Sequence, residues 1–462
     1  MEGDGFVTPS WRVWLPVTTF AVKIKITHQA TADTPTVIQA LASAGQDAKR
    51  TVMPHHFPCR FLLTRRQALG ALGALPVFAV GATGMNSGAQ AQALPGGAPV
   101  LVGIDGEFGL INSTSAQAVE LGARIAIAEI NKAGGVLGRP MAVVTRDHRS
   151  IPARGIKNIR EFAGMKDLVA VLGGRFSPVI IEQLPALKAS KLPFIAVWSA
   201  ADAIVDNGTQ PNYVFRLSMR DSLAMPYMMT SAQQRGLTKV GLLLTNTSWG
   251  RSNLAAVEKF SATQRRPEVV ETAWYNWQER SLVDRYLKLL NAGAKAIVLV
   301  ANDDEAALLV REVAALPKDQ RIPIISHWGV TGGRFFKEAG PALKEVDFSV
   351  IQTFSFFQAS KEELSRFMAT ANELGVQRFE DIESPVGVAH AYDAVHLLAM
   401  AVRQAKSTNR SAVRNALEKL PPHQGLVRRY APAFTASRHE ALDTRQLLMA
   451  RYREDGVVVP MN

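Results

Sequence analysis

Glycine is the residue type whose spacing first suggests chemistry in this chain. The stretch NKAGGVLGRP places Gly134, Gly135 and Gly138 within five positions, a density that lets a backbone approach a phosphate closely. A phosphate loop, however, lies between a strand and the following helix, so that the helix N-terminus faces the anion. Here the glycines follow a helical pattern and precede a strand pattern. They are therefore predicted to form a corner that ends a helix, with Gly134 or Gly135 left-handed and Pro140 preventing its resumption.

Histidine, serine and cysteine patterns do not indicate an enzyme. From residue 94 onward we find neither Gly-x-Ser-x-Gly nor His-Glu-x-x-His. The six histidines of this region are scattered: His148, His327, His390, His396, His423 and His439. Cys59 is the only cysteine, so one chain can hold no disulfide and no cysteine-based metal site. We expect no catalysis, no cofactor and no metal.

The region from Val100 onward alternates short apolar runs with helical faces. The predicted strands are 100–104, 141–147, 168–174, 193–199, 240–245, 296–301 and 322–326, and the predicted helices are 115–132, 153–165, 178–190, 221–235, 250–262 and 304–316. Thr114 and Gln117 have capping-box spacing before the first helix. Strands separated by helices indicate parallel sheets covered on both faces, and two such series indicate two lobes. In such sheets ligands bind beyond the carboxyl ends of the strands.

Composition and charge are those of an ordinary globular protein. The 462 residues suffice for two domains, with 47% hydrophobic and 20% charged residues. The formal net charge is +12, but residues 94–462 contain no run of five like charges and no basic helix interleaved with aromatics. We therefore expect no nucleic-acid partner.

Residues 63–93 have the features of an export signal. Arg65 and Arg66 precede an apolar run at 68–82, and AQAQA at 89–93 offers the small residues that a signal peptidase accepts. The arginine pair resembles a twin-arginine export motif, and a single membrane anchor is the alternative. We expect residues 1–93 to be an N-terminal extension plus signal, cleaved near Ala91–Ala93. The mature protein would then be periplasmic.

Residues 122–150, GARIAIAEINKAGGVLGRPMAVVTRDHRS, resemble the N-terminal signature of the branched-chain amino-acid-type solute-binding proteins of ABC importers. YVFRL, TSWGRSN and AHAYDAVHLLAMAV are similar to later landmarks of that family, in the same order. The resemblance implies an α/β, leucine-binding-protein-like type I periplasmic binding fold, with three crossings near 216–220, 353–356 and 431–434. Lobe 1 would comprise 94–218 and 354–432, and lobe 2 would comprise 219–353 and 433–462.

The resemblance also implies where a solute binds. Ser177 lies in the loop after the third strand, where the family has a serine that caps a helix and contacts the solute. Ser199 and the amides of Ala200 and Ala201 follow the fourth strand, and Trp249 occupies a position where relatives have an aromatic residue over the solute. The remaining candidates in cleft-facing loops are Phe108, Phe176, Trp198 and Trp328, with the polar residues Glu107, Arg175, Asn302 and Asp303.

One departure from the family concerns the solute's amine. Amino-acid binders carry an acidic residue near 326–330 that pairs with the ligand ammonium, and this sequence has Trp328 there. Either Glu107 or Asp303 replaces it, or the solute lacks an amine and is an aromatic or aliphatic acid or an amide. Arg175 either pairs with an anionic head or is an exposed loop arginine.

The resemblance implies a non-catalytic, monomeric receptor that delivers a small-molecule solute to an ABC permease, of the amino-acid transport type. A sensor for a membrane signalling protein is the alternative, and an exported hydrolase is a remote one.

Overall fold

The computed structural model describes residues 96–461, so the predicted export signal, Cys59 and the rest of residues 1–95 lie outside the described part. The first sheet has five parallel strands in the order β2-β1-β3-β4-β5. These strands are β1 (Val100–Gly106), β2 (Met141–Asp147), β3 (Leu168–Gly173), β4 (Phe194–Ala196) and β5 (Val214–Arg216). Apolar side chains point from both faces of these strands into two separate clusters of buried residues.

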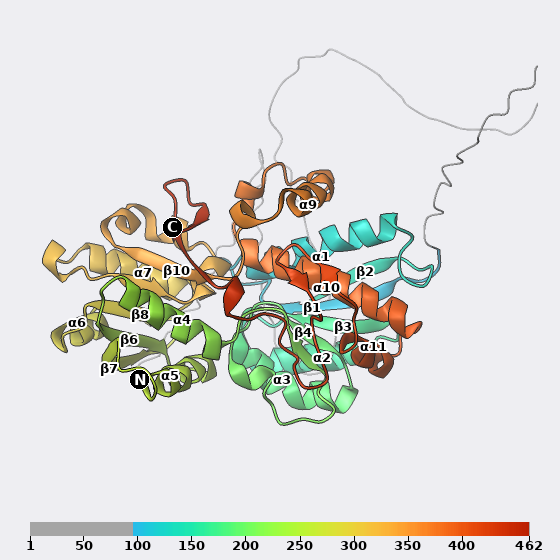
Figure 1. The fold of residues 1–462 in the computed structure, drawn as a ribbon, viewed down its shortest axis with the longest axis horizontal. Helices are drawn as coiled ribbons and strands as arrows, with labels where there is room; N and C mark the ends of the chain where they lie inside the picture. The colour runs from blue at the N-terminus through green and yellow to red at the C-terminus, as the bar shows by residue number, and fades with distance from the viewer. Residues whose placement is uncertain (1–95, 462) are drawn as a thin grey trace, which may run out of the picture. The chain divides into compact units, whose positions relative to one another are not determined.

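Helices cover both faces of this sheet (Figure 1). They are α1 (Ser115–Lys132), α2 (Pro152–Gly164), α3 (Ser177–Ser190), α9 (Lys361–Glu373), α10 (Pro385–Ala405) and α11 (Arg410–Leu417). α1 packs along α10, and α2 packs on α3. The contact between α1 and α10 is close, because a Cβ added at Gly122 would lie 2.1 Å from the Val388 carbonyl oxygen. α10 is long and apolar enough to span a membrane, but 83% of its most apolar window is buried, as in a core helix.

The second sheet has seven strands in the order β14-β13-β10-β9-β8-β6-β7. They are β6 (Lys239–Thr245), β7 (Glu268–Tyr275), β8 (Ala296–Val300), β9 (Ile324–Ser326), β10 (Phe348–Gln352), β13 (Leu448–Tyr452) and β14 (Val458–Pro460). β6 to β10 are parallel, whereas β13 and β14 add antiparallel pairs at one edge. Its helices are α4 (Asp221–Gln234), α5 (Ser248–Ser261), α6 (Val283–Asn291), α7 (Asp303–Ala314) and α8 (Phe335–Ala339). A short hairpin of β11 (His423–Gln424) and β12 (Arg429–Tyr430) stands apart.

The predicted two-sheet α/β architecture is confirmed, and α1 has the predicted bounds. The glycine-rich stretch is the predicted corner between α1 and β2, with φ of 90° at Gly134 and 72° at Gly135. The capping box of Thr114 and Gln117 is wrong. Thr114 is the N-cap residue, but its hydroxyl contacts the Ser384 hydroxyl at 2.9 Å instead of a helix N–H. The elements that were not predicted include β7, α6, β10 and β13.

Strands β1 to β5 lie in the first sheet and β6 to β10, β13 and β14 in the second, so the chain changes sheet after β5. That it crosses between the lobes three times stays a prediction. Phe434 and His439 pack against Phe215 of β5, and pairing with the second sheet begins only at Leu448. We use lobe 1 for the elements around the first sheet and lobe 2 for those around the second. The lobe bounds remain a prediction, and we propose that the third passage extends over residues 431–447.

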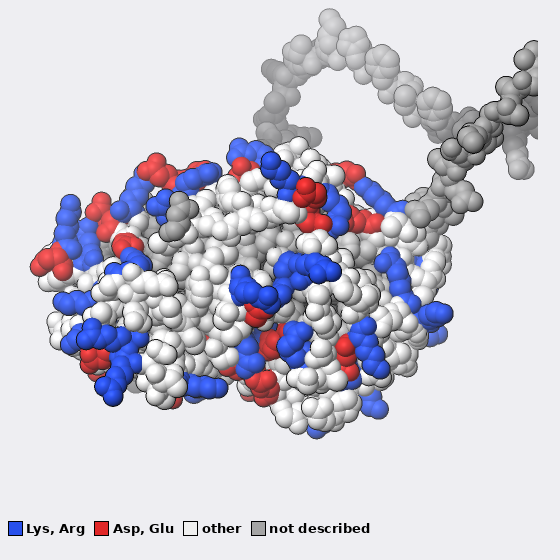
Figure 2. Space-filling view, in the orientation of Figure 1, with Lys and Arg blue, Asp and Glu red and all other residues white. Residues whose placement is uncertain are grey.

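Charged side chains of both signs intermingle on the surface (Figure 2). Several form local pairs, such as Arg445 with Asp443 at 2.6 Å and Arg453 with Asp455 at 2.5 Å. On the face shown in Figure 2, the two signs are mixed, so this face gives no broad field of one sign. That the protein has no nucleic-acid partner stays a prediction.

Candidate functional site

The residues of the predicted site lie in loops after strands of both sheets, at the carboxyl ends where ligands bind in such sheets. Lobe 1 contributes the loops after β1, β3 and β4, and lobe 2 contributes those after β6, β8 and β9. These loops meet directly. Ser113 forms an antiparallel bridge with Gly333, and the Thr114 N–H donates to the Gly332 carbonyl at 2.9 Å. The structure therefore brings the two halves of the predicted site into contact.

Ser177 binds the neighbouring loop rather than its own helix. Phe176 is the N-cap residue of α3, Pro178 stands in the first turn, and no side chain caps the helix. The Ser177 hydroxyl accepts a hydrogen bond from the Ala201 N–H at 3.3 Å. The predicted capping role is therefore wrong, because Ser177 is already helical and a capping side chain must precede the first turn. Among the described residues, the N–H groups of Ser177 and Ala200 have no hydrogen-bond partner, although both residues are buried.

Asp221, the first residue of α4, links the two lobes at the centre of the cluster. Its N–H donates to the Ala200 carbonyl at 2.9 Å, and its carboxylate oxygen Oδ1 accepts from the Trp249 indole at 3.2 Å. His327 Nε2 lies 3.2 Å from the same oxygen, and its ring meets Trp249 edge-on at 5.0 Å. The other oxygen, Oδ2, is buried and has no partner in the described structure. An unpartnered buried carboxylate oxygen requires a donor from a ligand or water.

The tryptophans of both lobes form one buried aromatic group. Trp198 of lobe 1 lies 6.1 Å from Trp328 of lobe 2, and Trp328 lies 5.7 Å from His390 of α10. The Trp198 indole nitrogen and the Ser199 hydroxyl are buried without partners among the described residues. Burial lowers the pKa of His390 to about 4, so this ring is neutral near pH 7. The group supplies apolar contact area with a few polar atoms, as small-molecule sites do.

Arg175 forms a buried charged cluster with residues of both lobes. Its guanidinium pairs with Asp303, donates to the Gly329 carbonyl at 3.0 Å and lies 3.8 Å from Glu107. Burial lowers the pKa of Arg175, but the carboxylates of Asp303 and Glu107 outweigh this effect and raise it above its ordinary value. The interpretation of Arg175 as an exposed loop arginine is wrong, since the residue is only 7% exposed. Glu107 itself accepts hydrogen bonds from Ser113 and Ser115.

The remaining predicted residues lie around these two groups. Phe176 packs edge-on against Trp277 of lobe 2 at 5.4 Å. Asn302 precedes α7, and a Cβ at Gly329 would lie 2.9 Å from its side-chain oxygen and 2.8 Å from the Trp249 ring. Gly329 thus lets both residues approach the loop after β9. Phe108 is half-buried beside Gly106.

Two surface hollows open elsewhere. One of about 390 Å³ is bordered by parts of 353–363 and 424–448, and one of about 380 Å³ by parts of α1 and of residues 375–388. Their linings include neither Ser177 nor Asp221. Residues 96–461 contain no group of three His, Cys, Asp or Glu side chains placed to hold a metal ion. We assign the candidate site to the buried cluster, because its unpartnered polar atoms are what a ligand would satisfy.

Comparison with known proteins decides the family. A model of periplasmic binding proteins matches residues 99–456. This chain belongs to the periplasmic binding protein family. A Leu/Ile/Val-binding protein homolog from Brucella suis is 24% identical over 341 residues, which cover 71% of this chain and 85% of the relative.

Solved structures show the fold of this periplasmic binding protein to be the predicted type I fold. A leucine binding protein from Thermotoga maritima superposes with a TM-score of 0.67 at 17% identity, covering 79% of this chain and 98% of its own. A solute binding protein from R. palustris in complex with 4-hydroxybenzoate superposes with a TM-score of 0.68 at 16% identity, covering 79% and 96%. Neighbours of one fold thus bind chemically different carboxylates.

The sequence-based prediction for this periplasmic binding protein missed Asp221 and Trp277 and gave His327 no role in binding. An acidic residue at a helix start is typical of helix stabilisation, so Asp221 gave no separate signal. Trp277 lies near the carboxyl end of β7, in a segment with no predicted element. The position of His327 could have been used to predict that it lies in the site, because His327 directly precedes Trp328, which was a candidate.

Proposed function

We propose that this periplasmic binding protein is the solute-binding component of an ABC importer. It binds a small carboxylate-bearing solute between its lobes and releases it unchanged. The observation that carries this proposal is the buried Asp221, whose N–H contacts Ala200 of lobe 1 and whose carboxylate is held by Trp249 and His327 of lobe 2, with one oxygen still lacking a partner. The relatives that bind leucine or 4-hydroxybenzoate support the class of solute.

The carboxylate end of the solute lies against lobe 1. The N–H groups of Ser177 and Ala200 are free and buried, and Ser177 stands at the positive end of the α3 dipole. The free Ser199 hydroxyl adds a further donor. One donor at the start of α3 and two in the loop after β4 suit a carboxylate, which accepts several hydrogen bonds. Because Arg175 is already paired with Asp303, it is not assigned to this end.

The other end of the solute carries a hydrogen-bond donor. Asp221 Oδ2 accepts no hydrogen bond within the described part of the chain, and an ammonium group of the solute would supply the missing donor. Of the two alternatives raised by Trp328, this favours a solute with an amine, with Asp221 rather than Glu107 or Asp303 as the carboxylate that pairs with it. Trp328 packs on Trp198 and His390, and the carboxylate that the loop after β9 lacks is supplied by α4.

The geometry of His327 supports binding without catalysis. Its Nδ1 accepts from the Trp328 N–H at 3.0 Å, which leaves the proton on Nε2 directed at Asp221. That tautomer is assigned from the hydrogen-bond network. Both ring nitrogens are thus occupied, and neither can take a proton from a serine. A general base must lie within hydrogen-bond reach of the proton that it removes.

A thermal-shift screen of residues 94–462 tests the proposal. The screen compares L-leucine, 4-hydroxybenzoate, a dicarboxylate and a carboxamide. Solute at a hundred times its dissociation constant should stabilise the wild type by about 2.7 kcal/mol. Asp221→Asn should weaken an amine-bearing solute by roughly 100-fold, because the ammonium is left buried beside a neutral amide.

Asp284→Asn is the matched control, since Asp284 also stands in the first turn of a helix but is exposed. It should leave solute binding unchanged. A wild type that no compound stabilises would contradict the proposed function. A solute that binds Asp221→Asn as tightly as the wild type would contradict the role of Asp221.

A further inference from the structure

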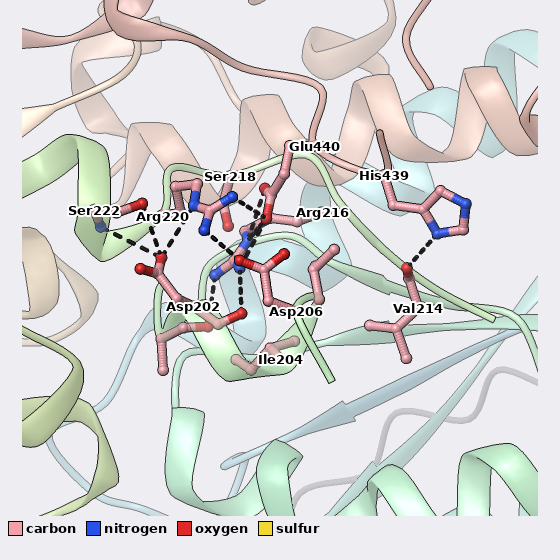
Figure 3. Close-up of polar contacts among 12 residues, drawn as sticks. Asp202, Ile204, Asp206, Val214, Arg216, Ser218, Arg220, Ser222, His439 and Glu440 are labelled. Atoms are coloured by element: carbon pink, nitrogen blue, oxygen red, sulfur yellow. Dashed lines mark hydrogen bonds and ion pairs between the residues drawn. The ribbon is translucent and has the colours of Figure 1, made fainter. Parts of the chain in front are cut away.

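The Arg216 side chain donates hydrogen bonds to several carbonyl groups of the loop that follows β4 (Figure 3). Its guanidinium donates to the carbonyls of Ser199 at 3.3 Å, Ala201 at 3.0 Å and Asp202 at 3.5 Å. The residue is 0% exposed. An arginine side chain has five donors in a rigid plane, so one residue can fix several carbonyls at once.

Neighbouring residues complete the set of carbonyl contacts. The Ser218 hydroxyl donates to the Ser199 carbonyl at 3.2 Å, and the Asp221 N–H donates to the Ala200 carbonyl at 2.9 Å. All four carbonyls from 199 to 202 are therefore held by residues 216–221. The amide N–H groups of the same loop are left to other partners: that of Ala201 donates to Ser177, and that of Ala200 is free.

The other edge of Arg216 is held by Glu440, from the passage that precedes β13. The Glu440 carboxylate lies 3.0 Å from Arg216 Nε and 2.9 Å from Nη2. The backbones are also joined, because the Arg216 N–H donates to the His439 carbonyl at 2.8 Å and the Ala441 N–H donates to the Arg216 carbonyl at 2.9 Å. Arg220 adds a contact to the Asp202 carboxylate at 3.1 Å. The loop is thus tied to two passages between the lobes.

We propose that Arg216 is a positioning residue that presents the Ala200 amide to the solute, and that Glu440 holds Arg216 in the orientation this requires. The inference rests on the proposed function, because that amide is assigned there to the solute carboxylate. It adds that the shape of the binding loop depends on a residue more than two hundred positions away, in a passage between the lobes. Movement of that passage would change solute affinity without any contact to the solute.

The test compares Glu440→Gln with Glu418→Gln. Glu418 is buried like Glu440, with side-chain exposures of 8% and 10%, and it accepts from His439 at 2.9 Å without touching Arg216. Glu440→Gln keeps the side-chain shape but removes the charge that orients the guanidinium. We expect it to weaken solute binding by about 10-fold or more, as loss of a charged hydrogen bond does. Glu418→Gln should leave affinity within about two-fold of wild type, even where it lowers the melting temperature equally.

A second readout needs no solute. Amide ¹H–¹⁵N signals of Ala200 and Ala201 should move in ligand-free Glu440→Gln and in Arg216→Lys, whose ammonium cannot span three carbonyls, but not in Glu418→Gln. Unmoved signals in Glu440→Gln would overturn the inference and leave the proposed function intact. If no solute binds the wild type, the proposed function fails, and the amide signals still decide whether Arg216 and Glu440 shape the loop.

Discussion

The ion pair between Arg175 and Asp303 predicts how the lobes behave without solute. Asp303→Asn removes one charge while keeping the shape of the side chain. Both side chains are 4% exposed, and they come from different lobes. In the variant, the Arg175 guanidinium still donates to the Gly329 carbonyl at 3.0 Å and lies 3.8 Å from the Glu107 carboxylate. The perturbation therefore leaves a buried cation with partial compensation.

The expected magnitude is at the lower end of the range for such losses. Removing one partner of a buried ion pair costs about 3–5 kcal/mol. We expect a cost of about 3 kcal/mol here, because Arg175 keeps its contacts with the Gly329 carbonyl and Glu107. Separation of the lobes relieves this cost, because water then reaches the guanidinium. The cost therefore acts mainly on closure rather than on unfolding, and about 3 kcal/mol corresponds to a roughly 100-fold fall in the ratio of closed to open protein.

Small-angle X-ray scattering of the ligand-free protein measures this directly. We expect a larger radius of gyration for Asp303→Asn than for the wild type, and a solute affinity weakened by up to about 100-fold, since binding must now supply the cost of closure. Asp304→Asn is the control, because the Asp304 carboxylate is exposed and accepts a hydrogen bond from the Asn112 side chain across the lobes, at 2.8 Å. Equal radii and affinities for the two variants would refute the reasoning.

Three other predictions concern single residues. Gly122→Ala should lower the free energy of unfolding by about 1–3 kcal/mol, because the added methyl group overpacks against the Val388 carbonyl. Gly164→Ala is the control in thermal unfolding and should not lower it, because a Cβ there meets nothing within 4 Å. The pKa of His390 is about 4 in the folded state and 6.5 when unperturbed. Burial of the neutral ring therefore contributes stability that is fully present above pH 6.5 and is lost as the pH falls toward 4. The total loss in the free energy of unfolding is about 3 kcal/mol. Urea unfolding between pH 7 and 4 should show a shallower decline for His390→Gln, and equal slopes would exclude this role. Trp249→Ala should weaken solute binding by roughly 30-fold in calorimetry, as loss of a buried aromatic anchor does, and unchanged affinity would place the aromatic wall elsewhere.

The alternation of strands and helices was predictable because it depends on local periodicity. The predicted bounds of α1 agree with the structure since its apolar residues repeat at helical spacing and Gly134 ends it. β7 was missed for a related reason. It is an edge strand with mostly half-buried side chains, and its apolar signal is correspondingly weak. The antiparallel pairing of β13 is set by the return of a distant segment, which no local pattern reveals.

The site was predictable only in the loops that supply it. Ser177, Trp198 and Trp249 follow strands, so their position beyond the sheet edges could be inferred from the sequence. The contacts that define the cluster join distant residues. Arg175 is buried because Asp303, 128 positions away, neutralises it, and nothing near Arg175 in the sequence indicates that partner. The role of Ser177 changed for the same reason, since its hydroxyl binds Ala201 across the gap between two loops.

The buried polar atoms of the site also explain why closure and binding occur together. With the lobes in contact, Asp221 Oδ2, the Ser199 hydroxyl and the Trp198 indole have no partner in the described structure. Each such group costs about 1–3 kcal/mol when water is withdrawn from it. This sum is comparable with the few kcal/mol that the buried ion pair between Arg175 and Asp303 contributes to closure. Closure without solute is therefore finely balanced, and a molecule with a carboxylate at one end and a donor at the other shifts the balance toward the closed protein.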